Sequence, residues 1–187
     1  SLLIDPDNIS ITDQLSSPGN NLLDDNQIPV TEAPGLDVVI TSTRLETIGD
    51  VDVLLEAVES ILIGQIADGS LDFQQTAGQT VTFSAGETIR VEQGTSITTQ
   101  GGSLSFTGGD RVEVDSINAR GGTVSLISNT AIEALGTIES AGGTISYSIA
   151  GGNRTANIGN AEASSFVFDL DGINLSGNLI GLGGLDL

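Results

Sequence analysis

The fold of this protein is decided by GGSLSFTGGDRVEVDSINAR (101–120), which aligns with GGTVSLISNTAIEALGTIES (121–140) and then with GGTISYSIAGG (142–152). The preceding segment, GQTVTFSAGETIRVEQGTSITTQ (78–100), follows the same pattern. Apolar residues then fall into columns that recur about every 21 residues, which is typical of a repeat architecture. The first column holds Val81, Leu104, Val124 and Ile145, and the second holds Phe83, Phe106, Leu126 and Tyr147.

Further columns extend the repeat. They hold Ile89, Val112 and Ile132; Val91, Val114 and Ala134; and Ile97, Ile117 and Ile138. The segment GDVDVLLEAVESILIGQI (49–66) reads as an earlier copy, with matching apolar residues at Val51, Val53, Ile61, Ile63 and Ile66. The apolar pair Leu71 and Phe73 fits no column, so the phase of the repeat stays open between Leu71 and Val81.

Each repeat contains two or three short strands, whose inward residues lie two positions apart. One coil cannot bury these side chains alone, but stacked coils share a core and complete each other's backbone hydrogen bonds. The Gly-Gly pairs at 101–102, 121–122 and 142–143 suit corners that need positive φ. We therefore predict an all-β protein, a right-handed parallel β-helix with coils of about 21 residues. A β-sandwich or jelly roll is the alternative, but it would not place residues in columns at a fixed period.

Proline divides the chain into two zones. All four prolines lie in the first 34 residues, which are also rich in Asn and Asp and contain one strand-like stretch, Ser1–Thr12. Proline is rare inside sheets because it cannot donate to a neighbouring strand, so its absence after Pro34 suits stacked strands. We predict a Pro/Asn/Asp-rich N-terminal arm or cap over 1–36 and a β-helix shaft over 37–187 that ends in an apolar C-terminal coil.

The composition excludes several classes of function. The 187 residues contain no Cys, His, Met or Trp, and the five basic residues, all Arg, face 25 acidic ones, for a net charge of −20. Without Cys or His, thiolate or imidazole metal sites and Cys-His or Ser-His-Asp catalysis are excluded. The negative charge repels phosphate backbones, so we expect no nucleic-acid partner. Because the chain starts at Ser1, we expect a processed or excised piece of a precursor.

Three stretches resemble filamentous haemagglutinin-type exoproteins, and the cyanobacterial variants of that family most of all. They are LLIDPDNISI (2–11), ITSTRLETIGDVDVLLEAVESILI (40–63) and SLDFQQTAGQTVTFSAGETI (70–89). The resemblance covers about residues 1–150. It implies a right-handed β-helix, export through an outer-membrane two-partner transporter, an extracellular or cell-surface location, and a role in adhesion or surface structure. The secretion domain that precedes this region in the family is absent from the sequence.

Acidic pairs are the candidates for a metal site, because Ca²⁺ takes several oxygen ligands. They are Asp5 and Asp7, Asp24 and Asp25, and Asp169 and Asp171. The segment DLDGIN (169–174) has the Asp-x-Asp-Gly of an EF-hand loop but lacks its remaining ligands and closing Glu. We interpret these acids as solvated turn residues and predict no cofactor, with calcium as the alternative.

A β-helix can also be a polysaccharide-active enzyme, which would need paired carboxylates in one groove. The outward acids of the repeats are instead scattered, and Arg90, Arg111 and Arg120 are placed to pair with residues on adjacent coils. We therefore predict no catalytic residue. The second column could be mistaken for a sugar-stacking platform, but we interpret its aromatic rings as core.

The ends of a lone β-helix expose open strand edges that pair with other chains unless they are capped. We therefore expect a structural or adhesive protein whose subunits stack head to tail into surface filaments, so that its main partner is itself. The apolar residues expected at the contacts are Leu2, Leu3, Ile4, Ile9, Ile11, Ile173, Leu175, Leu179, Ile180 and Leu185. Two alternatives stay open: residues 1–36 cap their own end, or the chain is an adhesin fragment that binds surface glycans or a receptor.

Overall fold

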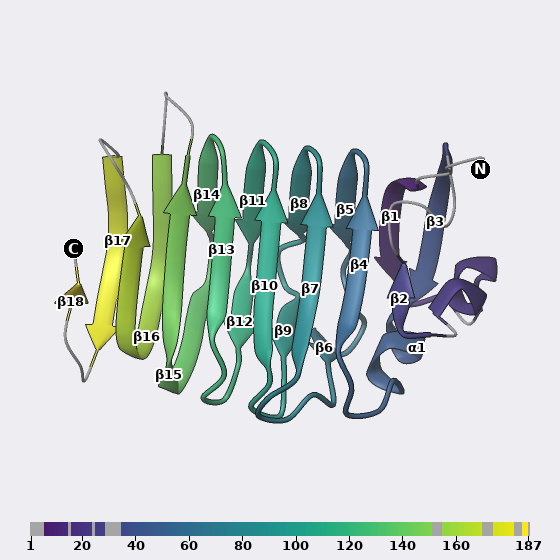
Figure 1. The fold of residues 1–187 in the computed structure, drawn as a ribbon, viewed down its shortest axis with the longest axis horizontal. Coiled ribbons are helices and arrows are strands. Elements are labelled where there is room, and N and C mark those ends of the chain that lie inside the picture. Colours follow the sequence, from purple (N-terminus) through teal and green to yellow (C-terminus); the bar gives the residue numbers. More distant parts are fainter. Residues whose placement is uncertain are drawn as a thin grey trace.

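The computed structural model describes residues 6–14, 16–23, 25–28, 35–150, 155–169, 174–181 and 185–186. Figure 1 shows one elongated stack of strands that runs from the N-terminal end to the C-terminal end. The early elements are β1 (Pro6–Thr12), η1 (Pro18–Leu23), β2 (Gln27–Ile28), β3 (Leu36–Thr41), α1 (Ser42–Glu46), β4 (Val53–Ala57), β5 (Ser60–Ile63) and β6 (Ser70–Asp72). The repeats supply β7 (Thr80–Ala85), β8 (Thr88–Val91), β9 (Ser96–Thr98), β10 (Ser103–Gly108), β11 (Arg111–Val114), β12 (Ser116–Asn118), β13 (Val124–Ser128) and β14 (Ala131–Ala134). The last elements are β15 (Thr137–Ile149), β16 (Thr155–Asp169), β17 (Asn174–Gly181) and β18 (Leu185–Asp186).

The strands form three faces, and every pairing among the described strands is parallel. The first face runs β2, β4, β7, β10, β13, then the later parts of β15 and β16, then β18. The second face runs β3, β1, β5, β8, β11, β14, then the start of β16 and of β17. The third face runs β6, β9, β12, then the start of β15, the middle of β16 and the end of β17. This is a parallel β-helix, as the repeat predicts.

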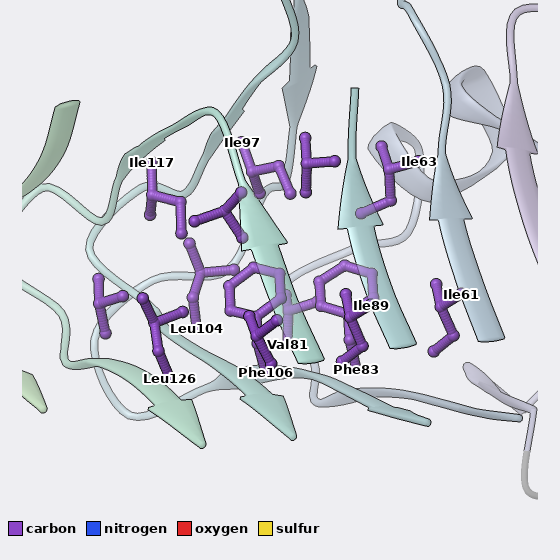
Figure 2. Packing of buried hydrophobic residues seen from close by; sticks show 14 of the residues in the cluster. Ile61, Ile63, Val81, Phe83, Ile89, Ile97, Leu104, Phe106, Ile117 and Leu126 are labelled. Carbon is purple, nitrogen blue, oxygen red and sulfur yellow. The ribbon is translucent and has the colours of Figure 1, made fainter. Parts of the chain in front are cut away.

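The register of the strands reproduces the sequence columns. In the first face Leu104 pairs with Val81 and Val124, and Val124 pairs with Ile145. The residues of all five columns are at most 1% exposed and share one core (Figure 2). Burying each large apolar side chain of this kind stabilises the fold by about 1.5–3 kcal/mol. The hydrophobic core is therefore continuous along the stack, and each coil shares it with the next.

The structure resolves the uncertain phase before Val81. Leu71 pairs with Ile97 on the third face and so belongs to the fifth column. Phe73 lies just after β6, fully buried, with its ring edge against Phe83 at 6.0 Å between centroids. The assignment of Val51 to the earlier copy is wrong, because Val51 precedes β4 and is 39% exposed.

Aromatic rings fill the middle of the first face. The rings of Phe83 and Phe106 stack at 5.0 Å with 9° between their planes, and Figure 2 shows them side by side. Leu126 interrupts the column, and the stacking resumes between Tyr147 and Phe168 at 5.4 Å. Burial raises the pKa of Tyr147, whose hydroxyl has no partner among the described residues. The aromatic column is core, as the sequence indicates.

The described part of residues 1–36 does not stand apart from the β-helix. Strand β1 lies inside the stack, between β3 and β5, and Ile9 and Ile11 are fully buried in the chain's own core. The prediction that Ile9 and Ile11 contact a neighbouring subunit is therefore wrong. Their alternation with polar neighbours gives the same sequence signal whether the pairing strand comes from this chain or from another.

The N-terminal end of the second face is covered by the chain itself. The short helix η1 packs on β3, which is the last strand there among the described residues. Ser17 donates from its hydroxyl to the carbonyl of Val39, and the amide of Thr41 donates to Oδ1 of Asn20 at 2.9 Å. These bonds satisfy backbone groups on the outer edge of β3, which a further strand would otherwise use.

The segment that contains TRLE (43–46) forms α1, a short helix beside β6 on the third face. The Thr41 hydroxyl accepts from the amide of Arg44 at 3.2 Å and caps this helix. Arg44 also donates to the carbonyl of Leu23, at 2.6 Å, and so ties α1 to η1. Together η1 and α1 cover the N-terminal end on two of the three faces.

Candidate functional site

The outward side chains of the first face are short hydroxyl groups on β7, β10, β13 and β15. We call this surface the hydroxyl face. The inward neighbours of these residues are buried, while the residues themselves are partly or fully exposed. Ile127, at 37% exposure, is the apolar exception on this surface. The hydroxyl residues are Thr80, Thr82, Ser84, Ser103, Ser105, Thr107, Thr123, Ser125, Thr144, Ser146 and Ser148.

None of these outward positions carries a charge, although the chain has a net charge of −20. Among the described residues, the acidic ones in strands of the first face lie at its margins, at Glu56 on β4, Asp169 on β16 and Asp186 on β18. The arginines and acids of the middle coils lie on the other two faces or in the turns between strands. An uncharged surface on a strongly acidic rod is the side that another uncharged surface can approach with the least electrostatic penalty.

The hydroxyl face has the geometry of a grid. Neighbouring strands of a parallel sheet lie about 4.8 Å apart, and outward residues along one strand repeat about every 6.6 Å. The register keeps the rows straight, because Ser105 pairs with Thr82 and Ser125, and Ser125 pairs with Ser146. Ser and Thr side chains are short, so they lose little rotamer freedom when they are held in rows.

The side chains of this grid make few bonds to one another. Thr144 and Ser165 share a hydroxyl–hydroxyl bond of 2.6 Å, and the hydroxyl of Ser103 accepts from the amide of Thr123 at 3.2 Å. No other hydroxyl of the grid has a hydrogen bond to the described part of the chain. Most of the grid is therefore free to bond to solvent or to a ligand.

The second face carries a ladder of alternating charges. Nε of Arg90 lies 3.2 Å from Oε1 of Glu113, and Arg111 bonds to both Glu113 and Glu133. The predicted pairing of the three arginines with adjacent coils is confirmed: Arg90 and Arg111 bond to carboxylates, and Arg120 donates to the neutral amide oxygen of Gln100 at 2.7 Å. Because each acid in the ladder has an arginine, the charges of the ladder are neutralised locally.

A shallow hollow of about 340 Å³ lies beside this ladder. Ala131, Thr155 and Ser176 belong to its lining, together with the ion pair of Arg111 and Glu133. The arginine and the carboxylate that border it are bonded to each other. The hollow therefore offers no free charge to a ligand.

Polar side chains also bridge the coils of the third face. Oδ1 of Asp72 accepts from the hydroxyls of Ser70 and Thr98, each at 2.6 Å, and these bonds lower the pKa of Asp72. Burial raises the pKa of the neighbouring Glu46, which accepts from the amide of Asp72 at 3.2 Å. These carboxylates bond to groups of their own chain, and this arrangement holds adjacent coils together.

The predicted calcium ligands that the structure describes lie on separate elements. Asp5, Asp24 and Asp171 lie outside the described residues, while Asp7 lies on β1 and Asp169 ends β16. Asp25 uses its carboxylate to accept from the amide of Gln27 at 3.1 Å. The described residues contain no group of three or more acidic side chains placed to hold a metal ion.

The residues predicted to mediate assembly fall into three groups. Ile9 and Ile11 are core, as described above. Leu175, Leu179 and Ile180 lie in β17, and Leu185 lies in β18; both strands pair with β16. The remaining ones lie outside the described residues: Leu2, Leu3, Ile4 and Ile173.

Comparisons with known proteins give no match: no protein family, no curated protein and no solved structure is similar enough to this chain to identify it. The resemblance to filamentous haemagglutinin-type exoproteins therefore stays a hypothesis from the sequence. Among the described residues, no helix has the length and apolar character needed to cross a membrane.

The hydroxyl face is the feature that sequence reasoning missed. Its signal is present as the alternation TVTFS (80–84), SLSFT (103–107) and TISYS (144–148), in which every second residue is Ser or Thr. The apolar columns indicate which residues point inward, and they say nothing about the positions between them except that these face solvent. The hydroxyl residues gain meaning only when the strands are aligned side by side.

Proposed function

We propose that this chain is a non-catalytic, rod-like structural and adhesive module that contacts its target through the hydroxyl face. The observation that carries the proposal is the lack of charge over β7, β10, β13 and the first-face part of β15 (144–149) on a chain of net charge −20. A surface that is charged on every side would serve solubility alone. An uncharged side can instead be approached by a target without electrostatic repulsion.

The fold supports this role because a β-helix is stiff. Its middle strands pair on both sides with neighbouring coils, so the outward side chains sit on a fixed backbone. Rigid presentation lowers the entropy that a surface loses on binding. The location at the cell surface, the two-partner export route and the surface glycans as ligands belong to this proposal through the sequence resemblance.

The test is adhesion of protein-coated beads to uncharged and to anionic surfaces, for which cellulose and carboxymethyl-cellulose are matched probes. We expect the wild-type chain to retain beads on an uncharged surface, and the double substitution Ser105→Asp with Ser125→Asp to abolish retention. The matched control is Ser116→Asp, which places the same change on the third face. Equal retention of all variants, or of none, would contradict the proposal.

A head-to-tail filament is a second candidate, and the C-terminal end favours it. Among the described strands, β17 and β18 pair only with β16, so they leave a sheet edge that another chain can extend. The N-terminal end does not offer the matching edge on the second face, because η1 covers β3. A filament therefore requires η1 to move or the contact to use β2.

Sedimentation velocity at neutral pH over a wide range of protein concentration tests the filament. Growth of the sedimentation coefficient with concentration, and rods of several subunits in negative stain, would support it. A single monomeric species at the highest concentration would overturn it without affecting the proposal for the hydroxyl face.

A further inference from the structure

We infer that strand β1 is displaceable, and that β3 can take its place beside β5 to complete a regular coil. The inference concerns the N-terminal end of the rod and does not depend on the hydroxyl face. The order of the strands, their register and the contacts of β1 support it.

Strand β1 interrupts the stacking order of the coils. In the middle of the rod each first-face strand leads directly to the second-face strand of the same coil, as β4 leads to β5 and β7 leads to β8. Strand β2 lies beside β4 on the first face, and α1 packs against β6 on the third face. Between them in the chain comes β3, whose regular place is beside β5, but β1 lies there instead (Figure 1). Strand β3 is therefore displaced outward by the width of one strand.

The register lets β3 occupy this place with the same side chains inward. Ile9 of β1 pairs with Val38 of β3 on one side and with Ile61 of β5 on the other. The second inward residue of each strand follows two positions later, and all these inward residues are at most 5% exposed. A shift of β3 by one strand puts Val38 opposite Ile61 and keeps the alternation, whereas a slip by one residue would turn the core residues outward.

The bonds that hold β3 in its outer place come from residues that follow β1 in the chain. The amide of Thr41 donates to Oδ1 of Asn20 at 2.9 Å, and Nδ2 of Asn20 donates to the Thr41 hydroxyl at 3.0 Å. Asp13 accepts from the hydroxyl of Ser42 at 2.6 Å and so ties the end of β1 to the start of α1. Withdrawal of β1 together with this segment therefore also releases β3.

Strand β1 fits its place less regularly than the middle strands of the second face. Its pairing with β3 is shifted between Pro6 and Asn8, whereas β5 pairs with β8, and β8 with β11, without a shift. At the end of β1, Oγ1 of Thr12 is buried and has no hydrogen-bond partner among the described residues. A buried hydroxyl without a partner carries an uncompensated desolvation penalty. These features lower the free energy needed to withdraw β1.

The N-terminal end thus has two arrangements. With β1 inserted, Ile9 and Ile11 are in the core, so this is the major arrangement. With β1 withdrawn, β2, β3 and α1 form one coil on β4, β5 and β6, and the rest of the rod keeps its pairings. Local openings of this kind are sampled as minor states of a folded protein.

The experiment uses a pair of engineered cysteines that can be joined only in the minor arrangement. Val39 lies opposite Ser10, and Ser10 lies opposite Leu62, so Val39 and Leu62 are two strand spacings, about 9.6 Å, apart. Cysteines whose Cα atoms are more than about 7 Å apart cannot be bridged without backbone movement. The double substitution Val39→Cys with Leu62→Cys therefore reports β3 beside β5, and no natural thiol competes because the chain has no cysteine.

The whole chain is oxidised mildly at low protein concentration, and mass spectrometry identifies the intramolecular disulfide. We expect the Val39 and Leu62 positions to be joined slowly, and the control pair Ser10→Cys with Leu62→Cys, which are already opposite, to be joined quickly. Ile9→Ala weakens the hold on β1 and should speed the joining of positions 39 and 62 by about tenfold or more.

The matched control for Ile9→Ala is Ile89→Ala, which removes the same side chain from the same column in a middle coil. It should not speed the reaction comparably, because it leaves β1 in place. Circular dichroism should show every variant folded, and Ile9→Val replaces Ile9→Ala if the latter unfolds. No bond between positions 39 and 62 in either background, or equal acceleration by the substitutions at Ile9 and Ile89, would overturn the inference. Both outcomes leave the proposal for the hydroxyl face unchanged.

Discussion

Arg90 and Glu113 lie directly opposite one another on adjacent coils of the second face, with Nε of the arginine 3.2 Å from Oε1 of the carboxylate. Glu113 in turn lies opposite Glu133, and Arg111 bonds to both acids. The stacking of coils thus forces two like charges into register, and one arginine compensates for both.

Removal of Arg111 should therefore destabilise the fold through repulsion between Glu113 and Glu133. We expect Arg111→Gln to lower the free energy of unfolding by about 1 kcal/mol at low salt, in the range measured for cross-strand charge pairs. The loss should shrink at high salt, because these side chains are partly exposed and screened. Urea unfolding at two ionic strengths measures this. Arg120→Gln is the control, since its hydrogen-bond partner Gln100 is neutral and its attraction to Asp72 is the smallest of the influences on that carboxylate, so its effect should depend less on salt.

The stacked rings of Phe83 and Phe106 should be the most sensitive part of the core. We expect Phe106→Ala to cost about 3–5 kcal/mol, because it removes a fully buried ring and leaves a cavity. Phe106→Leu should cost clearly less, since Leu126 fills the same column in the next coil. Chemical denaturation of both variants provides the comparison, and equal losses would mean that the column does not share one packing environment.

The second glycine of each Gly-Gly pair should resist substitution for lack of space. A Cβ at Gly122 would collide with the carbonyl of Gly102 on the adjacent coil, so Gly122→Ala has to separate the coils. We expect a loss of about 2 kcal/mol or more, as for other overpacked sites. Gly49→Ala is the matched control, because nothing lies within 4 Å of its Cβ position and φ there is not positive. Thermal unfolding should separate the two variants clearly.

The carboxylate of Asp72 should make stability depend on pH. The hydroxyls of Ser70 and Thr98 lower its pKa in the folded state, so the stabilisation is complete above the unfolded pKa of about 3.9. It is lost as the pH falls through the lower folded value. We expect Asp72→Asn to be less stable than wild type near neutral pH, with the difference vanishing in strong acid. Urea unfolding at a series of pH values measures the difference, and a gap that persists in strong acid would contradict the assignment.

Lateral association should also depend on pH. The net charge of −20 keeps the rods apart near neutral pH, and this repulsion disappears near the isoelectric point of about 4.1. Light scattering during acidification should show particle growth as this pH is approached. A constant particle size down to that pH would mean that another force keeps the rods apart.

The sequence by itself determined the parallel β-helix and its columns, because an inward residue must recur wherever one coil lies on the next. It also predicted the arginine pairs, since cross-strand partners follow from the same register. Pairing partners across long separations were decided only by the tertiary structure. The sequence of β1 does not show that Ile9 pairs with Val38 and Ile61, and so lies in the chain's own core.

The glycine pairs likewise combine a feature that the sequence predicted with one that only the tertiary structure decided. The sequence predicted positive φ at the corners, and Gly101 and Gly121 have φ of 103° and 104°. It did not distinguish Gly102 and Gly122, which are required because neighbouring coils approach too closely for a Cβ. The hydroxyl face was likewise not visible in the sequence, because Thr82, Ser105 and Ser125 are each about one coil apart along the chain and become neighbours only when the coils stack. The alternation along one strand depends only on which side of that strand each residue lies, so the sequence shows it directly. A surface that spans several coils depends instead on which strands the backbone hydrogen bonds place side by side.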